Sequence, residues 1–261
     1  MAEIIVMNSE DQATRLAAGI FVDAVKDKAN AVWGLATGST PIKMYEHIAR
    51  IVKADNIDIS NVRGFALDEY VGLPDGHPES YRSFIEKNVI EQIGLDPKNV
   101  KTPNGNSDTL QTAGSVYEMQ IATAGGVDVQ ILGIGTDGHI GFNEPGSSLV
   151  SRTRIKTLTK QTREDNSRFF ASIDDVPIHC ITQGIGTIMD AKHLVLLAFG
   201  EKKADAIYKA VEGPITSSSP GSMLQMHPRA TFIIDEAAAS KLQYLEYYKW
   251  AYENKPNWQG I

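Results

Sequence analysis

Short apolar runs alternate with longer amphipathic stretches along this chain, and this alternation restricts the possible folds more than any other feature. The apolar runs are mostly bounded by Gly, Pro or Asp and lie at residues 4–7, 31–36, 63–67, 127–132, 194–199 and 231–234. Such runs are typical of strands buried on both faces of a sheet. Amphipathic patterns predict helices at residues 11–28, 40–53, 81–93, 109–124 and 202–211. The order of elements predicts an α/β fold with a mostly parallel sheet, covered by helices on both faces and joined by right-handed crossovers.

The length and composition favour one domain without staples. The 261 residues contain no internal repeat and no linker long enough to mark a boundary, so we expect a single domain over residues 1–261. A chain of this length buries well over half of its unfolded surface and needs no disulfide. The only cysteine, Cys180, is expected to be a buried apolar residue in a reducing compartment.

The net charge of −7 argues against a nucleic-acid or membrane surface, so positive contacts to an anionic substrate must be local. The N-terminus lacks the basic region of a secretory signal, and the longest apolar stretch is too short to span a bilayer. We therefore expect a cytoplasmic protein.

A polar segment at residues 143–177 interrupts the alternation and is too long for a simple connection. Long connections in compact domains are usually lids or binding elements, so we expect a lid at about residues 160–177, with a helix near residues 162–170. In open α/β sheets the ligand lies beyond the carboxyl ends of the strands. The chemistry is therefore expected just after each strand.

The turn at residues 37–41 follows a strand and precedes a helix, as a phosphate site at a helix N-terminus would. Gly38 permits a tight turn, Ser39 or Thr40 can cap the helix, and Pro41 suits its first position. A cap without a ligand is an equal alternative, because the Walker pattern is missing. Arg168 in the polar segment and Lys203 after a later strand could supply cations, although single surface cations usually have no ligand.

Two carboxylates follow the strand at residues 63–67. Side-chain directions alternate in extended chain, so Asp68 can point into a cleft while Glu69 points away. The alternative is that Asp68 caps the following turn.

A glycine-rich turn after the strand at residues 127–132 carries Asp137, His139 and Glu144. These groups suit general acid–base chemistry near neutral pH. A metal site is the competing interpretation, but no second His or Cys lies nearby, so we expect none. His77 is expected to shape the loop after Asp68, and the remaining histidines are expected to be structural or at the surface: His47, His179, His193 and His227.

Four stretches together resemble glucosamine-6-phosphate deaminases, in the same order and over essentially the whole chain. They are TGSTP at residues 37–41, LDEYVGLP at 67–74, GTDGHIGFNEP at 135–145 and NSRFF at 166–170, and the third is the most specific. The resemblance implies a modified Rossmann-like fold. It also implies conversion of glucosamine 6-phosphate and water to fructose 6-phosphate and ammonia, in amino-sugar breakdown and without a cofactor.

The resemblance also implies roles for individual residues. Asp68 would move a proton between C2 and C1 through an enolamine, and His139 would open the sugar ring, held by Asp137 and Glu144. The phosphate would be bound by Gly38, Ser39, Thr40, Arg168 and Lys203.

Some members of this family are homohexamers activated by N-acetylglucosamine 6-phosphate between subunits. The residues that correspond to activator contacts are Ser147, Arg154, Lys156, Thr157 and, by a looser match, Tyr247. Without the family, residues 147–157 read as a basic edge strand.

Three rival functions stay open. A 6-phosphogluconolactonase shares the Gly-x-Asp-Gly-His turn, but the Phe-Asn-Glu-Pro continuation at residues 142–145 favours the deaminase. A galactosamine 6-phosphate enzyme would differ only in sugar stereochemistry. A non-catalytic sugar-phosphate sensor would not need Asp68 as a base.

Overall fold

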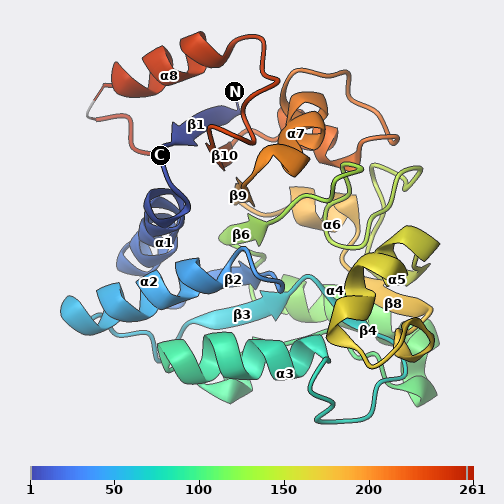
Figure 1. Cartoon of the computed structure of the whole chain (residues 1–261). Helices are drawn as coiled ribbons and strands as arrows, with labels where there is room; N and C mark the ends of the chain where they lie inside the picture. Colours follow the sequence, from blue (N-terminus) through green and yellow to red (C-terminus); the bar gives the residue numbers. More distant parts are fainter. Residues whose placement is uncertain (1, 257) are drawn as a thin grey trace.

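The computed structural model describes residues 2–256 and 258–261 and contains a seven-stranded parallel sheet (Figure 1). Its strand order is β1-β10-β9-β6-β2-β3-β5. The strands are β1 (Glu3–Met7), β2 (Val32–Leu35), β3 (Arg63–Ala66), β5 (Val100–Lys101), β6 (Val129–Leu132), β9 (His193–Ala198) and β10 (Ala230–Asp235). All six predicted strands are present, and β2, β6 and β9 are buried throughout, as their continuous apolar runs require. Of the strands in this sheet, only the two-residue edge strand β5 was not predicted.

Helices flank this sheet, and the five predicted ones are present. They are α1 (Glu10–Asp27), α2 (Ile42–Ala54), α3 (Tyr81–Ile85) with a π-helical continuation (Glu86–Glu91), α4 (Leu110–Thr123) and α7 (Ala204–Val211). Helices α6 (Ile185–Met189) and α8 (Leu245–Glu253) were not predicted. Ser9 caps α1 by accepting from the N–H of Gln12, and α8 packs beside β1 (Figure 1). In the described part of the chain, no helix has the length and apolar character that crossing a membrane requires.

A second, antiparallel sheet was not predicted and is central to the site. It has the order β4-β8-β7, with β4 (Asp68–Tyr70), β8 (His179–Thr182) and β7 (Arg154–Thr157). Strand β4 starts only one residue after β3 ends, so the chain leaves the parallel sheet at Leu67 and enters the small one. Helix α5 (Lys160–Asn166) and two 3-10 helices (Ser167–Phe169 and Ile173–Asp175) occupy the connection from β7 to β8.

A small apolar cluster lies between the second sheet and this connection. Its buried members are Tyr70, Phe142, Leu158 and Cys180, and Phe170 packs against it. Cys180 is fully buried and burial raises the pKa of its thiol, which confirms the prediction of an inert core residue.

Candidate active site

The strand order gathers the predicted site at one edge of the parallel sheet. Strand β6 lies between β9 and β2, and the segments that leave the carboxyl ends of these three strands are therefore neighbours. They enclose a cavity of about 90 Å³. Its lining comes from all three junctions: Ala36, Thr37, Thr40, Pro41, Ile131, Leu132, Gly133, Ile134, Leu197, Ala198 and Lys203.

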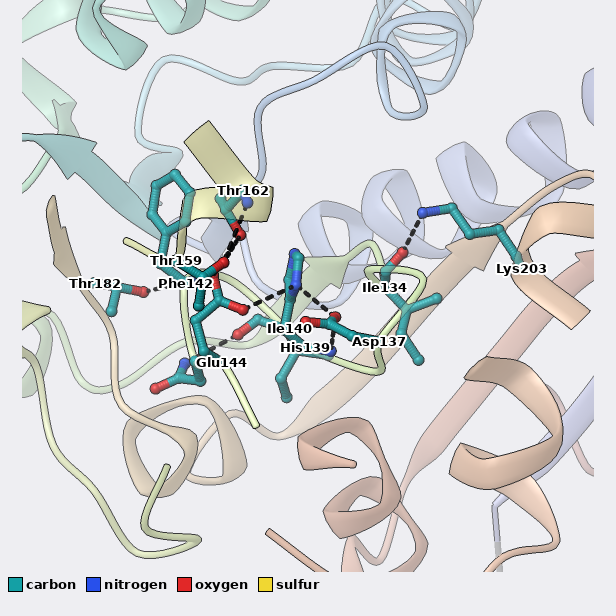
Figure 2. Close-up of polar contacts among 11 residues, drawn as sticks. Ile134, Asp137, His139, Ile140, Phe142, Glu144, Thr159, Thr162, Thr182 and Lys203 are labelled. Atoms are coloured by element: carbon teal, nitrogen blue, oxygen red, sulfur yellow. Dashed lines mark hydrogen bonds and ion pairs between the residues drawn. The ribbon is translucent and has the colours of Figure 1, made fainter. Parts of the chain in front are cut away.

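Lys203 gives this cavity its positive charge. Its Nζ donates to the carbonyl oxygen of Ile134 at 2.6 Å (Figure 2). Burial lowers the pKa of Lys203, while the carboxylates of Asp137 and Asp165 favour its charged form. The charge of Arg168 is close enough to lower the pKa of Lys203 further, so the two predicted cations are near each other although Arg168 does not line the cavity.

The predicted phosphate turn adopts the expected backbone, with one correction. Gly38 has a φ of +91°, which a side chain would strain, and Thr40 lines the cavity while Gly38 and Ser39 lie exposed beside it. Helix α2 begins at Ile42, after Pro41, and has no side-chain cap within the described residues. The prediction that Ser39 or Thr40 caps the helix was wrong, because Pro41 itself takes the cap position with a helical backbone.

The glycine-rich turn after β6 holds an imidazole between two carboxylates (Figure 2). Nδ1 of His139 lies 2.7 Å from Oδ1 of Asp137 and 3.6 Å from Oε2 of Glu144. The backbone N–H of His139 also donates to Oδ1 of Asp137, at 3.1 Å. A Cβ on Gly135 would lie 2.3 Å from the His139 ring, so the glycine is required for the imidazole to fold back over the turn.

These contacts set the charge of Asp137. Burial alone would raise its pKa, but the hydrogen bonds and charge of His139 hold the pKa of Asp137 well below its usual range. Asp137 is therefore anionic at neutral pH and fixes the imidazole that it contacts.

Asp68 lies on the other side of the site, in a position that makes its carboxylate basic. It is only 6% exposed. Burial, and then the charge of Glu69, raise its pKa to about 8. A Cβ on Gly141 would lie 3.4 Å from Oδ2 of Asp68 and 3.1 Å from Oγ1 of Thr182, so the glycine-rich loop passes directly over this strand. The second sheet therefore brings Asp68 to the loop that carries His139.

Glu69 points the other way, as predicted. Its carboxylate accepts the backbone N–H groups of Tyr70, Tyr81 and Arg82 at 2.8, 2.9 and 2.7 Å. Within the described residues no donor contacts the Asp68 carboxylate, so the capping alternative applies to Glu69 and not to Asp68.

The oxygens of Asp137 and Glu144 and a nitrogen of His139 lie within 4.8 Å of one another, which a metal site would also require. Nδ1 of His139 and Oδ1 of Asp137 lie at the distance of an ion pair, 2.7 Å, although Nδ1 has no hydrogen-bond partner of suitable geometry among the described residues. The same three groups are suited to acid–base chemistry.

The structure separates the predicted activator residues. Arg154, Lys156 and Thr157 lie on β7, and the Arg154 guanidinium donates to Oδ1 of Asn143 at 2.9 Å. Ser147 is buried at the end of the glycine-rich loop. Tyr247 is exposed and belongs to α8, and this helix lies at the β1 side of the molecule, away from β8, the partner of β7 (Figure 1).

The other histidines have structural contacts, as predicted. His193 is buried with Nε2 2.8 Å from Oγ1 of Thr231, and burial lowers its pKa to about 3. His47 contacts Asp11, His227 contacts the carbonyl of Ala191, and His179 is exposed. His77 stacks on Phe170 with ring centroids 6.0 Å apart, which ties its loop to the polar segment.

Sequence reasoning missed the threonines that hold Glu144. Oγ1 of Thr162 donates to Oε1 of Glu144 at 2.5 Å, and Oγ1 of Thr159 lies 3.4 Å from the same oxygen (Figure 2). The pattern Thr-x-x-Thr at a helix start could have located the first turn of α5, but no local pattern identifies a partner 18 residues away.

Comparisons with known proteins give one consistent family. A family model described as glucosamine-6-phosphate isomerases/6-phosphogluconolactonase matches residues 8–233. A glucosamine-6-phosphate deaminase of Bifidobacterium longum (strain DJO10A) is 57% identical over 270 residues and covers 100% of both chains. One of Pseudarthrobacter chlorophenolicus is 53% identical over 259 residues and covers 99% of this chain and 100% of its own length.

Solved structures agree with the fold. A structure described as a monomeric glucosamine-6-phosphate deaminase has a TM-score of 0.89 and 40% identity, covering 92% of this chain and 99% of its own. A 6-phosphogluconolactonase from Trypanosoma cruzi has a TM-score of 0.74 at 20% identity, covering 93% and 97%, and supports the fold alone.

Proposed function

The chain belongs to the glucosamine-6-phosphate isomerase/6-phosphogluconolactonase family, and from this premise we propose that it converts glucosamine 6-phosphate and water to fructose 6-phosphate and ammonia. The observation that carries the proposal is the meeting of two acid–base groups, because the glycine-rich loop that carries His139 passes over the Asp68 carboxylate at Gly141. Asp68 is a basic carboxylate on one side, and His139 is fixed by Asp137 on the other. Such a pair suits proton transfer on a sugar carbon and requires no redox cofactor.

The proposed steps assign one proton movement to each group. His139 moves the proton between the hydroxyl and the ring oxygen that opening of the sugar requires. Asp68 then removes the proton from C2 to give an enolamine and returns it to C1. Water adds at C2, ammonia leaves, and the C2 ketone of fructose 6-phosphate remains. A base whose pKa is about 8 is matched to this task near neutral pH.

Binding of the substrate phosphate is proposed for the turn at residues 38–40 and for the two nearby cations, Arg168 and Lys203. Lys203 and Thr40 line the cavity, and Arg168 lies within electrostatic reach of Lys203. Phosphate binding at this distance from C1 and C2 would supply binding energy remote from the reacting carbons. We further propose that residues 1–261 form one domain, with residues 160–177 as a lid that excludes water.

Assembly and regulation are a finer proposal. By family resemblance we propose a cytoplasmic homohexamer activated by N-acetylglucosamine 6-phosphate at a site that includes Arg154, Lys156 and Thr157. Helix α8, which carries Tyr247, lies away from β8, the partner of β7, so participation of Tyr247 would require a second subunit. The solved relative at 40% identity is described as monomeric, which makes the oligomeric state the deciding measurement. A monomer by light scattering, with substrate saturation unchanged by the acetylated sugar phosphate, would contradict this finer proposal.

The test of the activity is coupled detection of fructose 6-phosphate and ammonia from glucosamine 6-phosphate. We expect both products in equal amounts. If neither is released, the activity is wrong and hydrolysis of 6-phosphogluconolactone becomes the next assay. Saturable binding of the sugar phosphate without turnover would instead indicate a sensor.

A further inference from the structure

The Glu144 carboxylate lies between Thr162 and His139, and each of these residues is nearest to a different carboxylate oxygen. Glu144 is 4% exposed. Oε2 lies 3.6 Å from Nδ1 of His139 and has no hydrogen-bond partner within the described residues. Oε1 accepts the Thr162 hydroxyl at 2.5 Å. The orientation of the oxygen that faces the imidazole therefore depends on the hydroxyl that holds the other oxygen.

Thr162 is itself fixed by the first turn of α5. Thr159 caps this helix: its Oγ1 accepts the N–H of Thr162 at 3.1 Å and lies 2.9 Å from Oγ1 of Thr162. The β-branched Thr162 side chain is 7% exposed, so few rotamers are open to it. The helix start consequently determines where the Thr162 hydroxyl points.

The same short helix also contacts the strand that carries the base. Nδ2 of Asn166 donates to the Tyr70 hydroxyl at 2.9 Å, and Tyr70 is two residues from Asp68 on β4. Thr162 and Asn166 are four residues apart, which places them on one face of the helix. Helix α5 thus contacts both the His139 loop and the Asp68 strand.

We propose that Thr162 is a positioning residue for the acid–base chemistry: its hydroxyl holds Oε1 of Glu144 so that Oε2 faces the His139 imidazole. Thr162 does not contact the substrate in this role and acts only through Glu144 and His139. The consequence for catalysis rests on the proposed deaminase function, whereas the consequence for the His139 environment does not.

The chain provides a closely matched control. Oγ1 of Thr187, on α6, donates to Oε1 of Glu118 at 2.5 Å and the residue is 6% exposed. Thr162→Val and Thr187→Val therefore each remove one buried hydroxyl from one carboxylate. Only the first carboxylate faces His139, because Glu118 contacts Thr153, Thr187 and Arg152.

The first measurement is steady-state deamination by wild type, Thr162→Val, Thr162→Ser and Thr187→Val. We expect kcat of Thr162→Val to fall by about tenfold, the effect of one lost charge-assisted hydrogen bond, with KM changed less than about twofold. Thr162→Ser restores the hydroxyl and should recover most of kcat. Thr187→Val should keep wild-type kcat. Equal losses of kcat in the two valine variants, or none in Thr162→Val, would overturn the proposal.

The second measurement needs no activity. The ¹⁵N resonances of the His139 imidazole, identified by their absence in His139→Gln, should move in Thr162→Val and stay in place in Thr187→Val. The titratable groups that face this carboxylate are Asp137 and His139 on the loop and the neutral Cys180 thiol on β8, and all three are unchanged in both variants. If the wild type releases no ammonia, the proposed function fails, and the resonances still decide the role of Thr162. Unmoved His139 resonances in Thr162→Val would overturn the proposal. If Thr162→Val does not fold, the serine variant decides: a loss of kcat in Thr162→Ser with unmoved His139 resonances would overturn the proposal.

Discussion

Asp68 and Glu69 are adjacent and both are buried, but their carboxylates differ in their hydrogen-bond donors. Glu69 accepts three backbone N–H groups, two of them from the start of α3. Asp68 receives no donor within the described residues, and its anion is further disfavoured by the charge of Glu69. The same two-residue sequence thus provides one carboxylate that anchors a helix and one that is kept basic, as the proposed proton transfer requires.

Asp68→Asn should abolish turnover while leaving substrate binding largely intact. The amide keeps the shape of the side chain but cannot accept the C2 proton, so we expect kcat to fall by roughly 10³-fold, within the range of general base catalysis. The Kd for fructose 6-phosphate, measured by calorimetry, should change little because the phosphate contacts are elsewhere. Asp205→Asn, at a surface ion pair with Lys241, is the control and should keep wild-type kcat. An active Asp68→Asn would place the base at another residue.

The same substitution should change how stability depends on pH. The pKa of Asp68 is about 8 in the folded state and near 3.8 in the unfolded state, so between these values the folded state binds more protons. The contribution of Asp68 to the free energy of unfolding is fully present below pH 4 and is lost as the pH rises through 8. The loss is at most about 1.4 kcal/mol per pH unit.

Asparagine has no charge to desolvate, so Asp68→Asn should gain stability relative to wild type over this window. Urea unfolding of both proteins at pH 5, 6, 7 and 8 measures the difference. A difference that stays constant from pH 5 to pH 8 would mean that Asp68 titrates normally in the folded protein.

At the scale of elements, close backbone contacts join α4 to the second sheet. A Cβ on Gly114 of α4 would lie 2.3 Å from the carbonyl oxygen of Thr153, next to the start of β7. A Cβ on Gly19 of α1 would have no atom within 4 Å apart from the backbone of its own helix. Two glycines in helix interiors therefore differ only in what packs against them.

Gly114→Ala should destabilise the protein and Gly19→Ala should stabilise it. Alanine gains up to about 1 kcal/mol of helix propensity at either position. At Gly114 the backbone of α4 or β7 must shift, which costs about 1–3 kcal/mol and exceeds the gain. Urea unfolding gives both free energies. Stabilisation by both substitutions would show that α4 and β7 move apart easily.

The sequence predicted the parallel sheet well, whereas of the second sheet it indicated only an edge strand within residues 147–157, which contains β7. Strands buried on both faces carry an apolar run that is legible locally, as at residues 194–199. Strands β4, β7 and β8 have three or four residues each, and Asp68 pairs with Thr182, more than a hundred residues away. No local pattern encodes such a pairing.

The sequence likewise predicted the parts of the candidate site that lie close together in the chain and missed those that depend on tertiary contacts. Asp137, His139 and Glu144 share one short loop, so their proximity follows from spacing in the sequence. The link from Thr162 to Glu144 and the capping role of Glu69 depend on tertiary contacts and were missed. The cap expected from Ser39 or Thr40 failed because Pro41 occupies the position that it would need.

At the scale of the whole molecule, the two ends of β9 (His193–Ala198) carry lysines with different surroundings. Lys192 precedes the strand and pairs with Asp128 at 2.7 Å, mostly exposed. Lys203 follows the strand and is half-buried at the cavity, and its Nζ contacts only the Ile134 carbonyl among the described residues. In a protein with a net charge of −7, we expect binding of an anion to depend on the second lysine and not on the overall field.

Sugar-phosphate binding should therefore raise the melting temperature through Lys203 and not through Lys192. A ligand at one hundred times its Kd stabilises the folded state by about 2.7 kcal/mol, which corresponds to roughly 5–10 °C for a chain of this size. For fructose 6-phosphate we expect this shift in wild type and in Lys192→Met. Loss of a charge-assisted hydrogen bond to phosphate weakens affinity by about 10- to 100-fold, so the melting temperature of Lys203→Met at the same ligand concentration should rise by about half as much or less. Thermal unfolding with and without ligand measures all three proteins. An undiminished shift in Lys203→Met would remove this lysine from the phosphate site and leave Arg168 and the turn at residues 38–40 to bind the anion.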